Sequence, residues 1–511
     1  MYRAPGSPPA PSTHSMGRPP GASRRHLGRT GLAIVPLVTF LAALGSLVPQ
    51  PALAATAGSW YSLGTTPSTM TPAVFETSDH RAYVLWTKQL GANTFTYEVA
   101  EFSATGKPLS GPASIFGTHY WGSLSDQPTI VDKGSAPLVI FDGQRSANAS
   151  DPYGKGCIVG ALGPTLPWAL QTWSLSANCV NPVGAASAND SGELSAAWPG
   201  GWTNGHGILY RIGHSPKIPA ATPDQHIALS GPAVAAHVAM ATDLGGNGHA
   251  YLAWVATGSS AGAQDGYYAK DLTSNGAVMR APGSGSKSAN ISPFGVPAMA
   301  NSLSRSGIFI AYCSNGPICN VELWRVPTAK APAVPASSGA ADIAISAGPD
   351  GRIWVAWYNE TKNTVSVVRS NKSVTAFGAA TTLATACAEH GLVGLTSGRW
   401  GRLGIALQCV NKQLKIEDFF TQAIVPLSIS PAHVTVVNGS AQKVIFQVTD
   451  VGDPVPGATV KVGTFSAKTN ASGTASVIFA KGNAPGQYSV VASGLNYVPA
   501  TSTVVVTKPA K

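Results

Sequence analysis

Aromatic and charged side chains gather in the polar segments that follow several short apolar runs of the chain. Aromatic rings can stack on the apolar faces of sugars, while carboxylates, amides and arginines bond hydroxyl groups. This combination predicts a set of ligand-binding residues, whose members are Trp121, Asp142, Arg145, Trp202, Asp265 and Glu360. The alternative is ordinary polarity of surface loops, with a few aromatic residues that anchor them.

Three members of this set are carboxylates, which raises the question of glycoside hydrolysis. That reaction generally needs two carboxyl groups placed across the scissile bond. Asp142, Asp265 and Glu360 fall in comparable segments, but pairing them requires distances that a sequence does not contain. We therefore predict no catalytic residue. The Gly-Ser-Gly-Ser run at residues 283–286 lies in a low-complexity segment and predicts a flexible spacer, not a serine nucleophile.

Metal and cofactor sites are not predicted. His119 and His206 are isolated histidines, and the CxxC or paired-histidine spacing of a zinc site does not occur. Glycine-rich phosphate loops in a strand–helix context do not occur either. We expect the protein to work without a cofactor.

The elements that must position the ligand-binding set come from one repeat. Each copy has a short apolar strand, a polar turn usually containing Gly or Asp, and an apolar strand that usually closes on an aromatic residue. The closing positions are on average about 54 residues apart, and they are Trp86, Phe141, Trp198, Trp254, Tyr312, Trp357 and Gln408. A third strand-like run follows most of them, and a more variable fourth run precedes the next copy.

This repeat predicts an all-β fold. With 56 Gly, 39 Pro and 11% charged residues, the composition disfavours long helices and a disordered charged chain. Four strands in about 50 residues is the spacing of a propeller blade. One small sheet cannot bury both of its faces, so blades must stack around an axis and close into a ring. We predict a seven-bladed β-propeller over residues 72–425, in which the closing aromatics pack between blades or, alternatively, stack on a ligand.

The composition changes at about residue 426, from where Cys and Trp are absent and Val alternates with Thr. About seven short strands separated by turn signals predict a β-sandwich over residues 426–511. This segment resembles bacterial immunoglobulin-like domains of the invasin type, and the residues that carry the resemblance are Pro456-Gly457-Ala458-Thr459-Val460, Thr469-Asn470 and Ser472-Gly473-Thr474-Ala475. The resemblance implies a spacer or an adhesive module.

The first 54 residues predict a cleaved signal peptide. A polar arm with Arg24 and Arg25 precedes an apolar stretch at residues 32–48, and small residues lead to a cleavage site after Ala54. The arginine pair resembles a twin-arginine signal; an uncleaved membrane anchor is the alternative. We place a linker at residues 55–71. The protein is then extracellular or cell-surface, with no stable membrane insertion after signal cleavage.

Charge and cysteine usage agree with export. Residues 1–54 contribute five of the 33 basic residues and no acid, so 28 basic and 23 acidic residues remain, and we predict no nucleic-acid partner. Six cysteines allow 15 disulfide connectivities. Pairing sequence neighbours is the simplest, and the predicted bonds are Cys157–Cys179, Cys313–Cys319 and Cys387–Cys409.

The repeats resemble sialidase-like propellers of the BNR type. The fragments that carry this resemblance are Ser187-Ala188-Asn189-Asp190-Ser191-Gly192 and Asp350-Gly351 with Trp354. The first lacks the expected tryptophan and the arginine signature of sialidases does not occur, so no catalytic residue is transferred. We predict a secreted or cell-surface binding protein for an extracellular glycan or protein. The alternatives are a glycoside hydrolase or lyase of sialidase-like architecture, and a structural component without a small-ligand site.

Overall fold

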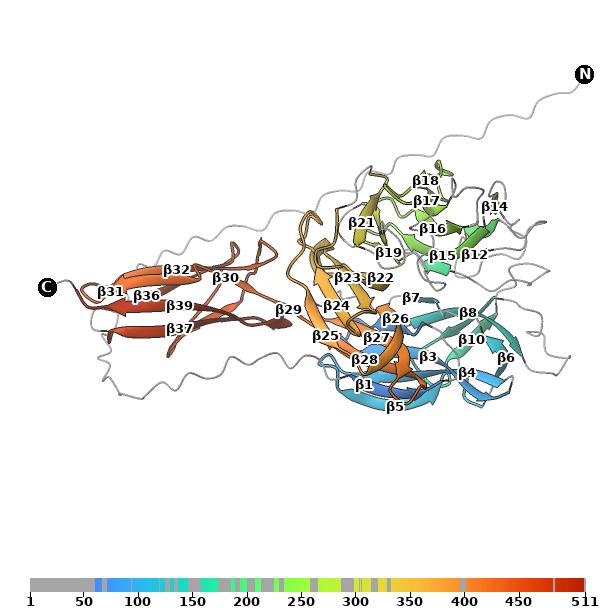
Figure 1. Ribbon diagram of the computed structural model, residues 1–511, viewed down its shortest axis with the longest axis horizontal. Coiled ribbons are helices and arrows are strands. Elements are labelled where there is room, and N and C mark those ends of the chain that lie inside the picture. Colours follow the sequence, from blue (N-terminus) through green and yellow to red (C-terminus); the bar gives the residue numbers. More distant parts are fainter. Residues whose placement is uncertain are drawn as a thin grey trace, which may run out of the picture. The chain divides into compact units, whose positions relative to one another are not determined.

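The computed structural model describes two stretches of strands, one on each side of residue 426. The described residues are 60–66, 71–92, 94–118, 120–124, 129–132, 137–145, 158–172, 185–188, 194–199, 207–212, 225–228, 234–257, 265–285, 298–302, 304, 306–313, 320–328, 332–395, 401–480 and 483–509. They form strands and one short 3₁₀ turn, Pro349–Gly351 (Figure 1). Across these ranges no α-helix occurs, which confirms the predicted all-β class.

The strands before residue 426 follow the seven predicted repeats and pair antiparallel in chain order. The first repeat contains β2 (Ala73–Glu76), β3 (Ala82–Gly91), β4 (Thr94–Phe102) and β5 (Pro108–Ser114). The second contains β7 (Thr129–Asp132), β8 (Pro137–Arg145), β9 (Ile158–Leu162) and β10 (Ala169–Thr172). The third contains β11 (Ala185–Ala188), β12 (Leu194–Pro199), β13 (Ile208–Ile212) and β14 (Gln225–Ile227). An additional strand, β6 (Trp121–Leu124), pairs with both β4 and β8 and so joins the first two repeats.

The remaining repeats continue this order. The fourth repeat contains β15 (Val234–Thr242), β16 (Ala250–Thr257), β17 (Gly266–Asp271) and β18 (Met279–Arg280), and the fifth contains β19 (Ala298–Asn301), β20 (Ile308–Cys313) and β21 (Val321–Val326). The sixth contains β22 (Ala340–Ala347), β23 (Ile353–Asn359), β24 (Thr364–Arg369) and β25 (Thr381–Ala384). The seventh contains β26 (Cys387–Leu395), β27 (Leu403–Asn411) and β28 (Ile416–Ala423). Each second strand has a neighbour on both sides, so its residues are buried almost throughout, as in β23.

The closing positions of the second strands lie inside the protein. Trp86, Phe141, Trp254, Tyr312 and Trp357 are each exposed by 2% or less, which confirms the prediction that they pack in the interior. Trp198 lies in β12, but its side chain is outside the described part of the structure. Burial of such large rings supplies much of the stabilisation that a small sheet lacks by itself.

The first strands of the seven repeats contact one another in sequence. They are β2, β7, β11, β15, β19, β22 and β26, and β26 in turn contacts β2. The last repeat also takes a strand from the N-terminal side, because β1 (Tyr61–Thr65) pairs antiparallel with β28 (Figure 1). The predicted linker at residues 55–71 is therefore wrong for residues 61–65, which are a strand of the seventh sheet. Local patterns miss this strand because its partner is more than 350 residues away.

The strands after residue 424 form a second core. They are β29 (Val425–Pro426), β30 (Ser428–Ser430), β31 (His433–Val437), β32 (Gln442–Asp450), β33 (Asp453–Pro454), β34 (Thr459–Val462), β35 (Phe465–Lys468), β36 (Thr474–Phe479), β37 (Gly486–Ser493), β38 (Tyr497–Val498) and β39 (Ala500–Thr507). One sheet contains β30, β32, β33 and β36, and another has the order β31-β39-β37-β34-β35. Alternate residues of both sheets, such as Phe446 and Val490, share one hydrophobic cluster.

One predicted disulfide is described completely. Cys387 of β26 and Cys409 of β27 are bonded, with their Cα atoms 5.6 Å apart. Cys313 is also in a disulfide, and its partner lies outside the described residues. The pairings Cys157–Cys179 and Cys313–Cys319 stay predictions. The segment predicted to be a signal peptide, residues 1–54, lies outside the described part of the chain, and within that part no helix is long and apolar enough to span a membrane.

Candidate functional site

The first predicted ligand-binding residue, Trp121, is buried. It begins β6, is 1% exposed, and packs against Phe116 and Phe141 with ring centroids 5.5 and 5.2 Å away. The preceding residue, Tyr120, is 47% exposed. Successive residues of an extended chain point to opposite sides, so the sequence His119-Tyr120-Trp121 places its tyrosine outward and its tryptophan in the core. The expectation of an exposed Trp121 does not agree with this burial.

Asp142 and Arg145 lie within β8 and not in a loop, because this strand extends beyond its closing residue Phe141. The Cα of Arg145 is opposite that of Trp121, and the Cα of Asp142 is opposite that of Ile158. The structure therefore brings two of the predicted residues, Trp121 and Arg145, to adjacent strands. The side chains of Asp142 and Arg145 are not described, and Trp202 lies outside the described residues altogether.

Asp265 and Glu360 lie between second and third strands, as predicted. Asp265 precedes β17 and is 6% exposed, and its backbone oxygen accepts a hydrogen bond from Arg280 Nη2 at 2.5 Å. Glu360 follows β23 and is half-buried. Burial, followed by the negative charge of Glu360, raises the pKa of Tyr358 to about 12. Of the two carboxylates, Glu360 is the one accessible to a ligand in solution.

The turn that carries Glu360 is held by a small hydrogen-bond network. Asn359 Nδ2 donates to the carbonyl of Ser338 at 2.9 Å, and Asn359 Oδ1 accepts from the backbone N–H of Lys362 at 3.0 Å. The Tyr358 hydroxyl donates to Asn363 Oδ1 at 2.8 Å. These bonds fix the turn at the end of β23, so Glu360 is presented from a rigid support.

Asp342 is a functional candidate that the sequence analysis missed. It lies in β22, where the register against β23 shifts between Ala340 and Asp342, and such bulges are frequent beside active sites because they re-aim side chains. Its Oδ2 accepts a hydrogen bond from the backbone N–H of Val393 in β26 at 2.7 Å. The surrounding protein disfavours the charged form and raises the pKa of this carboxyl to about 7. Asp342 can therefore give or take a proton at neutral pH.

Tyr267 of the fourth repeat interacts electrostatically with Asp342. Burial, and then the charge of Asp342, raise the pKa of Tyr267 in β17. The ring of Tyr267 is 5.5 Å from that of Tyr312, whose hydroxyl donates to Glu322 Oε2 at 2.8 Å. The signal that could have identified Asp342 is a lone carboxylate in an otherwise small and apolar first strand.

A carboxyl group that is fully buried belongs to the seventh repeat. Asp418 of β28 is 0% exposed, and its Oδ1 accepts a hydrogen bond from Gln408 Nε2 at 3.0 Å. Burial raises its pKa to about 8. Gln408 and Asp418 are also opposite each other in the β27–β28 register. The polar closing residue of this repeat therefore forms a hydrogen-bonded pair where the other repeats place an aromatic ring. Among the described side chains, no group of three or more His, Cys, Asp and Glu could hold a metal ion.

Comparisons with known proteins give only distant structural likenesses. No family model matches the chain, and no curated protein matches it. The polysaccharide lyase Uly1 is 10% identical over 70% of this chain and 90% of its own, with a TM-score of 0.40. The NanB sialidase of Streptococcus pneumoniae is 11% identical over 70% of this chain and 69% of its own, with a TM-score of 0.37. A protein of unknown function from Dyadobacter fermentans is 10% identical over 71% and 99%, with a TM-score of 0.39. Such low scores carry no argument about activity.

Proposed function

We propose that this chain is a secreted or cell-surface binding protein, in which a seven-bladed β-propeller binds a glycan or protein ligand. The proposed propeller covers residues 72–425 together with β1, and the proposed immunoglobulin-like β-sandwich covers residues 426–511 as a spacer or adhesive module. The observation that supports the propeller most strongly is the order of contacts among the seven first strands, which returns from β26 to β2. The pairing of β1 with β28 supports a ring held together by both ends of the domain.

The candidate binding residues in the described part are Tyr120 and Glu360. Both are accessible, and each lies beside a rigid element, β6 or β23. An exposed ring and an accessible carboxylate are the groups that stack on a sugar ring and bond its hydroxyls. Trp202, Asp142 and Arg145 remain proposed members of this surface, whereas Trp121 acts through the packing that supports Tyr120. The Cys387–Cys409 disulfide supports the proposed export, because disulfides persist in oxidising compartments.

A glycan array with the mature chain tests this proposal. We expect Tyr120→Ala and Trp202→Ala each to weaken binding by about tenfold or more, since one stacked ring contributes on the order of 1.4 kcal/mol. Phe465→Ala is the matched control, because Phe465 is also an exposed aromatic (49%) but belongs to β35. Unchanged binding by both tested variants, or an equal loss in the control, would contradict the assignment of this surface.

A glycoside hydrolase or lyase is the second candidate, with Asp342 as its proposed general acid. A carboxyl with a pKa of about 7 can protonate a leaving group at neutral pH, as a general acid must. Hydrolysis of chromogenic glycosides, together with eliminative cleavage of uronic-acid polysaccharides, would reveal such an activity. Asp342→Asn should then abolish the rate, and Glu360→Gln should lower it if Glu360 is the second carboxyl. Turnover that persists in Asp342→Asn would remove Asp342 as the general acid, and no turnover by the parent chain would count against this candidate.

A further inference from the structure

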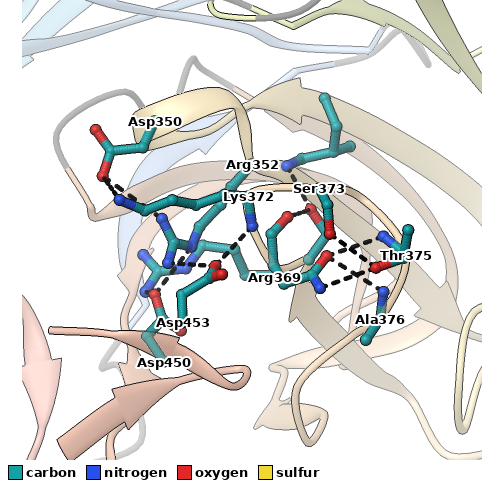
Figure 2. A network of polar contacts seen from close by, with 12 residues as sticks. Asp350, Arg352, Arg369, Lys372, Ser373, Thr375, Ala376, Asp450 and Asp453 are labelled. Carbon is teal, nitrogen blue, oxygen red and sulfur yellow. Dashed lines mark hydrogen bonds and ion pairs between the residues drawn. The ribbon is translucent and has the colours of Figure 1, made fainter. Parts of the chain in front are cut away.

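A buried group of ions lies between the sixth repeat and the C-terminal sheets. Arg369, the last residue of β24, and Asp450, the last residue of β32, are both 0% exposed, with Arg369 Nη2 2.5 Å from Asp450 Oδ2. Arg352, just before β23, is 3% exposed. Its Nε lies 3.1 Å from Asp450 Oδ2 and its Nη2 2.8 Å from Asp453 Oδ2 (Figure 2). We call Arg352, Arg369, Asp450 and Asp453 the junction cluster.

Aromatic rings from both sides enclose the cluster. The guanidinium carbon of Arg369 lies 4.8 Å from the ring centre of Trp354 in β23 and 5.2 Å from that of Tyr497 in β38. The Tyr497 hydroxyl also donates to Asp450 Oδ2 at 3.3 Å. Cation–π contacts are strongest where the cation has lost its water. One arginine of the sixth repeat is therefore held by a ring of its own sheet and by two side chains of the C-terminal sheets.

The rim of the cluster is open to solvent. The backbone N–H of Lys372 donates to Asp453 Oδ2 at 2.7 Å, and Lys372 Nζ lies 2.9 Å from Asp350 Oδ2. The side chains of Lys372 and Asp350 are 45% and 63% exposed, so water and salt screen this outer pair. The inner ions have no such screening, and their pairing depends on the relative position of the two parts that supply them.

A strip of backbone contacts continues the same interface. β29, which directly follows the seventh repeat, pairs in parallel with β38, and the N–H of Leu427 donates to the carbonyl of Val498 at 3.0 Å. Arg402 Nε donates to Asn496 Oδ1 at 2.7 Å. The chain that connects the two parts is therefore bonded to the second part from its first residues, which leaves no free linker at this point.

We propose that the junction cluster fixes the C-terminal sheets on the sixth repeat in a single orientation, so that the sixth repeat and the C-terminal sheets move as one rigid body and not as two domains on a hinge. Separation would hydrate the ions, so their net stabilisation is small compared with their attraction. The cluster nevertheless selects one orientation of the two parts, because any other packing of these surfaces would bury Arg369 and Arg352 without their carboxylate partners. The C-terminal part is then a rigid support and not a flexible spacer.

Pulsed electron paramagnetic resonance on the mature chain tests this rigidity. Spin labels at Leu414→Cys in the seventh repeat and Ile445→Cys in β32 replace exposed side chains. We expect one narrow distance distribution in the otherwise unchanged protein. Asp450→Asn or Arg369→Met should widen it roughly twofold, since domains without a specific interface move relative to each other. A broad distribution in the parent, or an equally narrow one in both variants, would overturn the proposal.

Two controls keep the result interpretable. Arg81→Met removes an ion pair of similar length, Arg81 Nη1–Glu101 Oε1 at 2.6 Å, from an exposed position and should leave the width unchanged. If circular dichroism shows that Asp450→Asn and Arg369→Met do not fold, the distance distribution of Asp453→Asn tests the proposal instead. Asp453 is 22% exposed, and its loss removes one acceptor only from Arg352 and Lys372. About 1 M NaCl should not widen the parent distribution, and widening would count against a buried cluster. None of these outcomes depends on ligand binding.

Discussion

The buried Asp418 predicts an unusual dependence of stability on pH. Its pKa is about 8 in the folded protein and near 3.8 in an unfolded chain. Between these two values the unfolded chain has lost the proton that the folded protein keeps. The stabilisation is therefore complete below about pH 4 and is lost progressively as the pH rises to about 8. This is the reverse of the behaviour of a salt-bridged aspartate.

The magnitude follows from the same shift. One pKa unit corresponds to about 1.4 kcal/mol, so the contribution of Asp418 should fall by about 4 kcal/mol between about pH 5 and about pH 8. Asp418→Asn cannot ionise, yet it retains an oxygen that can accept the hydrogen bond from Gln408 Nε2. The advantage of the variant over the parent should therefore be about 4 kcal/mol larger at the higher pH than at the lower pH.

Urea unfolding followed by tryptophan fluorescence measures this difference at both pH values. Asp350→Asn is the matched control, because Asp350 is exposed and ion pairing with Lys372 holds its pKa below the ordinary value. Relative to the parent, Asp350→Asn should not become more stable as the pH rises from about 5 to about 8. A difference between Asp418→Asn and the parent that is the same at both pH values would refute the reasoning, since the folded protein would then not keep this carboxyl protonated.

Three further predictions concern the framework. Removing the Cys387–Cys409 disulfide, which spans 22 residues, by Cys387→Ala together with Cys409→Ala should cost about 3 kcal/mol, measured as a lower urea midpoint. Trp254→Ala should destabilise by about 3–5 kcal/mol in the same assay, because a 1% exposed ring leaves a cavity; a smaller loss would mean that the site collapses. Gly394→Ala should lower the melting temperature, because a Cβ there would lie 1.9 Å from the Pro72 carbonyl oxygen, whereas Gly111→Ala, with no atom within 4 Å, should not.

The repeat could be read from the sequence because each second strand carries its own signal. Short apolar runs that close on Trp254 or Trp357 predict both the strand and its burial, since a large ring next to small apolar residues is usually found in a protein core. The third strands followed from the same pattern. The turn at Asp350-Gly351 was also visible, and Asp350 takes a positive φ of 54° there.

Long-range partners and buried ions could not be read in this way. β1 has no local signal for joining the seventh sheet, because its register with β28 is set by residues at the other end of the domain. The position of Asp450 in the alternating pattern of its strand does indicate burial. In β32 the buried positions alternate through Val444, Phe446 and Val448, and the next inward position is Asp450. A carboxylate in the inward phase of such a strand predicts a buried cationic partner, although not its identity.

Three aspartates lie where segments that are distant in the sequence meet. Asp342 bonds the backbone of the seventh repeat, Asp418 lies opposite Gly64 of β1, and Asp450 binds the arginines of the sixth repeat. Apolar surfaces alone tolerate small shifts in register, whereas a carboxyl group is satisfied in only one of them. If polarity at these joints selects one arrangement, then replacing Asp450 and Arg369 together with apolar residues should leave or raise the unfolding midpoint while broadening the distance distribution across the junction.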